Sequence, residues 1–209
     1  MRAIILDLGW GNIQALESFL SRIYCQIRIV DQKLAIEISE SELRWTDVFI
    51  PGVGSANLFP KEGDVHQLSD FCRKCHRVIG ICVGFHFMCR SSEESKGAKL
   101  LELLPLDVKK LKNQKLNLGY FDFGTQGISK SNKWRMYFCH SYGVQAPSKL
   151  DGCEFRSVEA SDNEHYIAYI VADKFIGLQF HPEKSGQLGV EFIDSIVRGR
   201  VLPTVKSVN

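Results

Sequence analysis

Long apolar runs are missing from this sequence. No stretch approaches the roughly 20 consecutive apolar residues that a membrane-spanning helix needs. The apolar run at the N-terminus is interrupted by Gly9 and Gly11, too early for a secretory signal peptide. We therefore expect a cytoplasmic protein with no membrane partner.

An excess of charge of one sign is also missing. Lys and Arg number 26 against 24 Asp and Glu, a formal charge of +2, which is too balanced to indicate a nucleic-acid partner. Internal repeats, low-complexity tracts and clear linkers are absent as well. Because 44% of the residues are hydrophobic and 24% are charged, the composition is that of a globular protein. We expect a single domain that spans residues 1–209.

Cysteine, by contrast, is present in an odd number. The chain has seven cysteines and no sign of export, so we expect reduced thiols with one candidate reactive cysteine among them. The run Cys-Arg-Lys-Cys-His at 72–76 matches the attachment pattern of c-type haem. Such attachment requires export, and no second ligand pair suits zinc. We interpret the run as the end of a helix and predict no metal site.

Apolar periodicity indicates an α/β fold. The first half alternates strands with helices, which predicts a mostly parallel sheet covered on both faces. In the second half, several strands joined by turns predict an antiparallel extension before a closing helix. The expected strands are 2–8, 26–30, 47–50, 77–81, 106–111, 119–123, 135–140, 152–158, 166–171 and 175–180, and the expected helices are 13–24, 34–43, 65–75 and 189–201.

One of the seven cysteines stands where a strand meets a helix. Cys82 lies in the run Gly-Ile-Cys-Val-Gly at 80–84. Small residues on both sides of a nucleophile allow the sharp turn that exposes its side chain above a sheet. The N–H groups at the start of the following helix would favour the thiolate. A buried cysteine in a tight turn is the alternative interpretation of so short a motif.

Two further segments could complete such a site. His181 and Glu183 flank a proline after a predicted strand, so Glu183 could orient the imidazole as a base for Cys82. None of the other five histidines has a carboxylate so placed along the sequence. The run Pro-Gly-Val-Gly at 51–54 could offer backbone N–H groups to an oxyanion, although a plain glycine-rich turn is equally compatible. Gly9 and Gly11 lack the third glycine of a dinucleotide site.

In combination, these segments resemble class I glutamine amidotransferases, and among them the glutaminase subunits of imidazole glycerol phosphate synthase. The resemblance covers nearly the whole chain. The stretches that carry it are Asp-Leu-Gly-Trp-Gly-Asn at 7–12, 51–54, 80–84, Ser-Glu-Glu-Ser-Lys-Gly at 92–97, His-Ser-Tyr at 140–142 and Gln-Phe-His-Pro-Glu-Lys-Ser-Gly at 179–186.

The resemblance implies a flavodoxin-like α/β fold, no cofactor, and hydrolysis of glutamine by a catalytic triad. In this scheme Cys82 attacks the side-chain amide, His181 is the base and later the acid, and Glu183 orients His181. Backbone N–H groups near Val53 and Val83 would form the oxyanion hole. The residues that would hold glutamine are Gly52, Gly54, His86, Ser141 and Tyr142. The implied partner is a (β/α)₈-barrel synthase/cyclase subunit that receives the ammonia in a heterodimer.

The sequence departs from the family pattern at two places. His86 stands where the family has the glutamine that helps to bind the amino-acid end of the substrate, and imidazole is more rigid and can carry charge. The family's His-Met-Gly-Trp on the partner-facing side reads Asn-Leu-Gly-Tyr at 117–120. Both departures concern recognition of substrate or synthase, while the triad is intact.

Several functions therefore stay open. One is the glutaminase of the histidine pathway, and another is a paralogue that supplies ammonia for amidination of a bacterial cell-surface sugar. A cysteine hydrolase that uses the same triad is a third, because the triad serves any acyl transfer. The fourth is a non-catalytic subunit retained for binding a synthase.

Overall fold

Five parallel strands form the centre of the larger sheet of the computed structural model, which describes residues 1–54, 59, 65–95, 97–111, 117–124, 133–159 and 164–199. The strands are β1 (Arg2–Asp7), β2 (Gln26–Asp31), β3 (Thr46–Ile50), β4 (Arg77–Ile81) and β12 (Phe175–Leu178). Their order, β2-β1-β3-β4-β12, is that of flavodoxin-like folds. Antiparallel β11 (His165–Ala172) and β10 (Glu154–Glu159) extend the sheet beyond β12.

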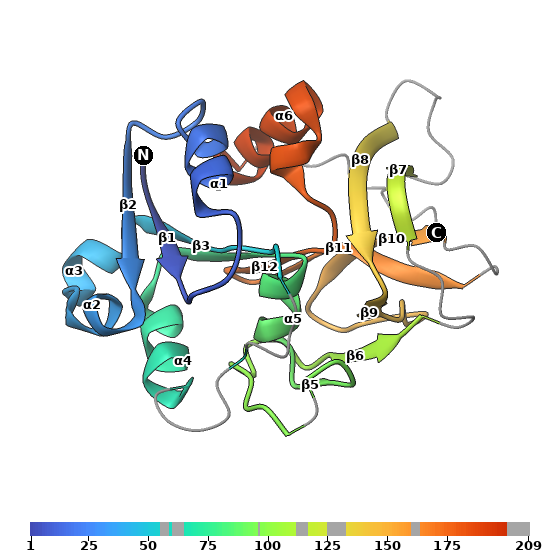
Figure 1. The fold of residues 1–209 in the computed structure, drawn as a ribbon, viewed down its shortest axis with the longest axis horizontal. Coiled ribbons are helices and arrows are strands. Elements are labelled where there is room, and N and C mark those ends of the chain that lie inside the picture. Colours follow the sequence, from blue (N-terminus) through green and yellow to red (C-terminus); the bar gives the residue numbers. More distant parts are fainter. Residues whose placement is uncertain are drawn as a thin grey trace.

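Helices cover both faces of this sheet. In Figure 1, α1 (Ile13–Leu20) and α6 (Gly186–Val197) lie on one side, and α4 (Val65–Lys74) and α5 (Val83–Met88) lie on the other. All five residues of β3 are buried, as expected of a strand that is covered on both faces. The predicted α/β architecture is therefore confirmed.

The predicted antiparallel extension is also present, and the structure adds two very short strands to those expected. Besides β10 and β11, it includes a hairpin of β7 (Asn117–Gly124) with β8 (Lys133–His140). A separate small sheet contains β5 (Ser91–Ser92), β6 (Asp107–Lys110) and β9 (Tyr142–Val144). The sequence did not predict β5 or β9, because two or three residues are too few for a periodic pattern.

Three predicted helices differ from the structure. The first, expected over 13–24, ends at Leu20. The segment 34–43 forms two short helices, α2 (Gln32–Glu37) and α3 (Glu40–Leu43), because Ile38 and Ser39 adopt extended backbone between them. The side chain of Asp31 caps the first of these helices by accepting the N–H of Leu34 at 2.8 Å. The closing helix begins at Gly186 and ends at Val197, and residues 200–201 of the prediction lie outside the described residues.

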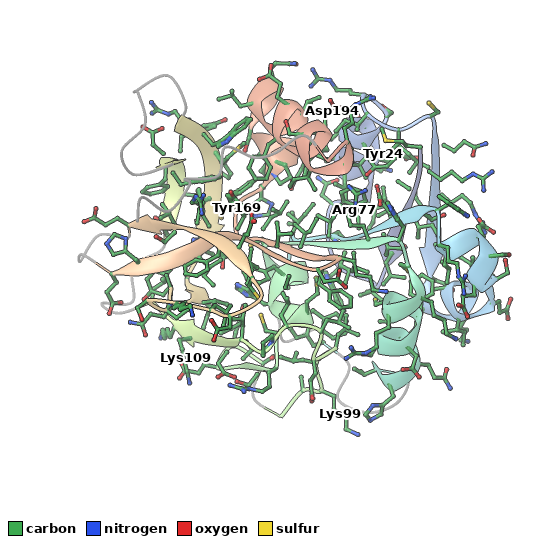
Figure 2. All side chains as sticks on the ribbon, turned by 180° about the vertical axis from the view of Figure 1, so that it is seen from behind. Tyr24, Arg77, Lys99, Lys109, Tyr169 and Asp194 are labelled. Atoms are coloured by element: carbon green, nitrogen blue, oxygen red, sulfur yellow. The ribbon has the colours of Figure 1, made fainter. Side chains whose placement is uncertain are left out.

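A polar cluster around the buried Asp47 lies at the amino-terminal edge of the sheet. Tyr24 donates its hydroxyl to Asp47 at 2.7 Å, and His76 Nδ1 lies 3.0 Å from the same carboxylate. Arg77 donates to the carbonyl of Ile196 in α6, and Figure 2 shows Tyr24 and Arg77 near this helix. Burial and the Asp47 carboxylate raise the pKa of Tyr24.

At the opposite, carboxyl-terminal edge, the ends of β3 and β4 approach very closely. A Cβ atom added to Gly84 would lie 2.2 Å from the carbonyl oxygen of Ile50, and one added to Gly52 would lie 2.1 Å from that of Ile81. Any side chain at either position would push the two strand ends apart. Ligands of open α/β sheets bind at this edge.

We predict that Gly84→Ala destabilises the protein by roughly 2 kcal/mol or more, because the added methyl group has only backbone to displace. Chemical denaturation measures the change. Gly152→Ala is the matched control: its φ is +73° with nothing within 4 Å of the added Cβ, so backbone strain of about 1 kcal/mol is the expected cost. Equal losses in the two variants would contradict the close approach.

Candidate active site

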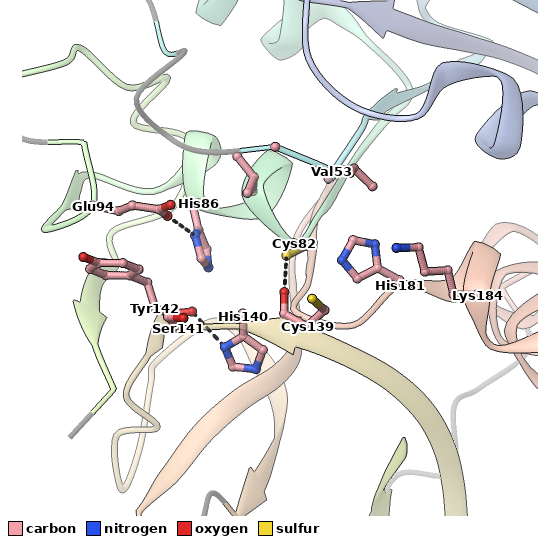
Figure 3. Close-up of a pocket in the computed structure, with 13 residues that line it drawn as sticks. Val53, Cys82, His86, Glu94, Cys139, His140, Ser141, Tyr142, His181 and Lys184 are labelled. Atoms are coloured by element: carbon pink, nitrogen blue, oxygen red, sulfur yellow. Dashed lines mark hydrogen bonds and ion pairs between the residues drawn. The ribbon is translucent and has the colours of Figure 1, made fainter. Parts of the chain in front are cut away.

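A pocket of about 360 Å³ lies at the carboxyl ends of β3 and β4 (Figure 3). It contains nine of the ten residues that the sequence analysis selects, and the tenth, Glu183, lies behind His181. The nine are Gly52, Val53, Gly54, Cys82, Val83, His86, Ser141, Tyr142 and His181. The fold thus brings together segments that are up to 129 residues apart, from Gly52 to His181.

Cys82 occupies a strained turn between β4 and α5. Its φ is +47° and its ψ is −107°, and it caps the N-terminus of α5. Such a backbone conformation costs a non-glycine residue about 1–3 kcal/mol. Its N–H donates to the carbonyl of Leu178 in the neighbouring strand at 2.6 Å, and its Sγ lies 3.8 Å from the carbonyl oxygen of Cys139. The turn holds the sulfur in the pocket wall.

An imidazole–carboxylate pair faces this sulfur. The Nδ1 atom of His181 lies 2.8 Å from Oε1 of Glu183, and their side chains are only 3% and 5% exposed. The backbone N–H of His181 donates to the carbonyl of Tyr137 at 2.8 Å, which ties the segment to β8. Figure 3 shows the ring of His181 turned towards Cys82.

The surroundings of His181 favour its protonated form. Burial alone would lower its pKa, but hydrogen bonds with Cys82 and Glu183 outweigh burial and raise the pKa of His181 to about 10. The imidazole of His181 can therefore accept a proton from the Cys82 thiol. An imidazolium beside a sulfur nucleophile can later donate that proton to a leaving group.

Backbone donors border the pocket on the side of the two strand ends. Val83 and Gly84 begin α5, so their N–H groups are not used in the hydrogen bonds of that helix. Val53 lines the same pocket from the end of β3. Free N–H groups at the start of a helix can stabilise a developing oxyanion.

His140 is a neutral part of the wall. Burial, followed by repulsion from His86, lowers its pKa to about 3. Its Nδ1 lies 2.8 Å from the carbonyl oxygen of Tyr142, and its Nε2 lies 3.2 Å from Nδ2 of Asn117. Since a carbonyl only accepts, Nδ1 carries the proton and Nε2 accepts from the amide. His140 therefore supports the Ser141–Tyr142 segment.

His86 is buried in the pocket wall with both ring nitrogens facing side chains. Only 1% of the residue is exposed. Its Nε2 lies 3.0 Å from Oε1 of Gln179, and its Nδ1 lies 3.8 Å from Oε2 of Glu94. Like His76 with Asp47, His86 meets a carboxylate that is not adjacent to it in the sequence.

Five further residues of this region were not expected from the sequence. Glu94, Cys139, His140 and Lys184 line the pocket, and Gln179 contacts Cys82 and His86. Four of the five lie inside the stretches that carry the family resemblance. Their position in those stretches was the signal in the sequence that could have identified them. Cys139 adjoins one of these stretches.

The Cys72–His76 run is the end of a helix, as predicted. α4 ends at Lys74, and burial raises the pKa of Cys75 to about 12. All seven cysteines are free. Among the described residues, no three His, Cys, Asp or Glu side chains gather as metal ligands, and no helix there is both long and apolar enough to cross a membrane.

We predict that Cys82→Ser lowers the pKa of His181, because the hydrogen bond with Cys82 is the largest contribution that raises it. In the wild type, the folded-state pKa of about 10 exceeds the ordinary 6.5. The resulting stabilisation is complete below about pH 6.5 and is lost as the pH rises through about 10.

NMR titration of the His181 ring measures this change. The His76 signal is the internal control, since His76 pairs with Asp47 at the other edge of the sheet from Cys82. An unaltered His181 titration in the variant would show that Cys82 and His181 do not interact.

Comparison with known proteins agrees with this geometry. The family model for class I glutamine amidotransferases matches residues 4–195. The imidazole glycerol phosphate synthase subunit HisH of Salmonella typhimurium LT2 is 29% identical over 209 residues, covering 94% of this chain and 99% of its own length. The same subunit of Escherichia coli K12 is 28% identical over 209 residues, with the same coverage.

Solved structures share the fold at low sequence identity. A chain of PurLQS from Thermotoga maritima superimposes with a TM-score of 0.67 at 16% identity, covering 95% of this chain and 98% of its own. A glutamine amidotransferase from the same organism gives 0.54 at 15% identity, with 96% and 86% covered. The match of the family model along most of the sequence decides the assignment: this chain belongs to the class I glutamine amidotransferase family.

Proposed function

We propose that this chain is a single-domain glutaminase subunit with Cys82, His181 and Glu183 as its catalytic triad. The observation that carries the proposal is the sulfur of Cys82 in a strained turn, facing an imidazole that is itself 2.8 Å from a buried carboxylate. This arrangement suits nucleophilic attack on an amide carbon.

The reaction follows from the positions of these groups. The Cys82 thiolate attacks the side-chain amide carbon of glutamine, and the N–H groups of Val53 and Val83 stabilise the oxyanion. The His181 imidazolium gives its proton to the amide nitrogen, ammonia leaves, and a γ-glutamyl thioester remains. Water then attacks the thioester and gives a proton to His181. The C–S bond breaks, releasing glutamate and regenerating the enzyme.

The remaining walls of the pocket are suited to hold the substrate. Gly52 and Gly54 present backbone at one side, and Ser141 and Tyr142 lie at the other. His86 and Glu94 lie in the same wall, where the amino-acid end of glutamine would bind. The pocket volume of about 360 Å³ is sufficient for one small amino acid.

We infer that the ammonia passes to a (β/α)₈-barrel synthase subunit of the imidazole glycerol phosphate synthase type. The HisH relatives support this, because they match along nearly their whole length. Leu118 and Tyr120 of β7 are 54% and 52% exposed. The hydroxyl of Tyr120 donates to the carbonyl of Lys184, a residue of the pocket wall. Exposed apolar side chains on a strand that contacts the pocket wall suit a partner that receives the product.

A paralogue that supplies ammonia for amidination of a cell-surface sugar is the second candidate. It is favoured by His86 at the position where the family has glutamine, and by Asn-Leu-Gly-Tyr at 117–120 on the partner-facing side. Either change is compatible with an intact triad and a different acceptor.

We predict that Cys82→Ser in the complex abolishes synthesis from glutamine and spares synthesis from added ammonium. The reason is that only the first route needs the sulfur nucleophile. Glutamate release and product formation are measured with both nitrogen sources. Persistent use of glutamine would exclude Cys82 as the nucleophile. If the wild-type complex released no ammonia from glutamine, the chain would be a binding subunit, and peptide hydrolysis would indicate a cysteine hydrolase.

Deletion of the gene in its own host separates the two acceptors. We predict histidine auxotrophy that is relieved by a wild-type copy and not by the Cys82→Ser copy at limiting ammonium. Growth without histidine, together with loss of amidine groups from the surface polysaccharide, would favour the paralogue instead.

A further inference from the structure

A second set of polar side chains reaches the sulfur of Cys82 from the side away from His181. Figure 3 shows His86 and His181 on opposite sides of Cys82 in that view. The triad accounts for the His181 side. On the other side, Gln179 lies between Cys82 and His86, with its Nε2 atom 3.9 Å from Sγ and its Oε1 atom 3.0 Å from His86 Nε2.

The register of the central sheet places Gln179 beside Cys82. Leu178 at the end of β12 pairs with Ile81 at the end of β4. Gln179 and Cys82 directly follow these two residues, so they lie side by side. His86 lies one helical turn after Cys82, and its N–H donates to the carbonyl of Cys82 at 3.0 Å. Gln179 is completely buried, so its amide depends on these neighbours for hydrogen bonds.

The chemistry of the neighbours determines which way this amide points. The carbonyl oxygen of Gln179 only accepts hydrogen bonds, so the facing Nε2 of His86 carries a proton. The amide nitrogen of Gln179, which only donates, is then directed at the sulfur. The opposite orientation would require the other tautomer of His86, in which Nε2 accepts, and it would direct the carbonyl oxygen of Gln179 at the Cys82 sulfur, where a thiolate would repel it.

Carboxylate and imidazole groups around His86 support this arrangement. Glu94 Oε2 lies 3.8 Å from Nδ1, at the far end of the His86 ring from Gln179. His140 is the other titratable group beside His86, but its two nitrogens are used by Tyr142 and Asn117. At this distance the Glu94 carboxylate is a charged neighbour of His86 and not a hydrogen-bond acceptor, whereas the Nε2 atom of His86 holds Gln179.

We propose that His86 and Gln179 form a second hydrogen-bonded chain to Cys82, with the Glu94 carboxylate 3.8 Å beyond the His86 ring, and that this set, here termed the Gln179 network, keeps an amide N–H on the Cys82 sulfur and favours the thiolate. Gln179 is then a catalytic residue that touches the reacting atom, and His86 and Glu94 are positioning residues. The inference rests on the proposed function only in taking Cys82 as the nucleophile. In this chain, His86 acts mainly through Gln179.

The rate of alkylation of Cys82 by iodoacetamide as a function of pH tests the network without glutamine. We expect Gln179→Met and His86→Leu each to move the midpoint of this profile upward by about half a pH unit. That shift corresponds to about threefold slower alkylation below the midpoint. Peptide mass spectrometry resolves Cys82 from the exposed Cys25, whose profile is the internal reference.

Two controls separate positioning from general damage. His86→Gln retains a side-chain donor for Gln179 Oε1, so its midpoint should stay at the wild-type value. His76→Leu removes a histidine that pairs with a carboxylate at the opposite edge of the sheet, and it should not move the Cys82 midpoint. Unchanged midpoints in folded Gln179→Met or His86→Leu protein would overturn the proposal.

A measurement on the wild-type protein tests the proposal even if the variants do not fold. NMR of ¹⁵N-histidine-labelled wild type shows which ring nitrogen of each histidine carries a proton. The network requires the proton on Nε2 of His86. The signal that is lost in His86→Gln identifies the His86 ring. A proton on Nδ1 alone would reverse the Gln179 amide and overturn the proposal. Because neither measurement involves glutamine turnover, a protein without glutaminase activity could still confirm the network, and an active one could still refute it.

Discussion

The close approach of two strand ends controls the geometry of the pocket. The segment after β3 and the turn after β4 pass so near each other that Gly52 and Gly84 have no room for a Cβ atom. This contact sets the position of the Cys82 turn, whose positive φ is unfavourable for a residue with a side chain. Burial of β3 and β4 on both faces offsets the free-energy cost of the strained Cys82 turn. The Cys82 sulfur and the backbone of both loops are therefore positioned together.

Around this sulfur, buried polar groups are arranged in pairs, because a buried polar group without a partner is unfavourable. Glu183 and His181 are both almost fully buried, and such a pair is stable only while each partner remains. The same reasoning applies to His86 and Gln179 on the other side of Cys82. His140 shows the contrasting solution, since burial keeps it neutral and its two nitrogens hold structural hydrogen bonds. Three buried histidines within one pocket thus have three different environments.

Much of the fold and of the candidate site was predictable from local sequence. The apolar runs of β3 and β4 and the glycines around Cys82 indicate strand, sharp turn and helix directly. The proximity of His181 and Glu183 follows from their spacing across Pro182. The strands β5 and β9 were not predictable, because they are too short to show a period and form only by pairing with β6. The break at Ile38 and Ser39 was missed for a similar reason, since helical spacing continues across it.

The sequence by itself determined the α/β class, the candidate nucleophile and the resemblance to glutamine amidotransferases, because these depend on residues that are neighbours in the chain. Only the tertiary structure decided that His86 faces Gln179 and Glu94, and that His76 meets Asp47. The physical reason is that strand register and loop packing bring together residues that are far apart in the chain. The state of a buried imidazole follows from those distant groups and from the loss of water around it.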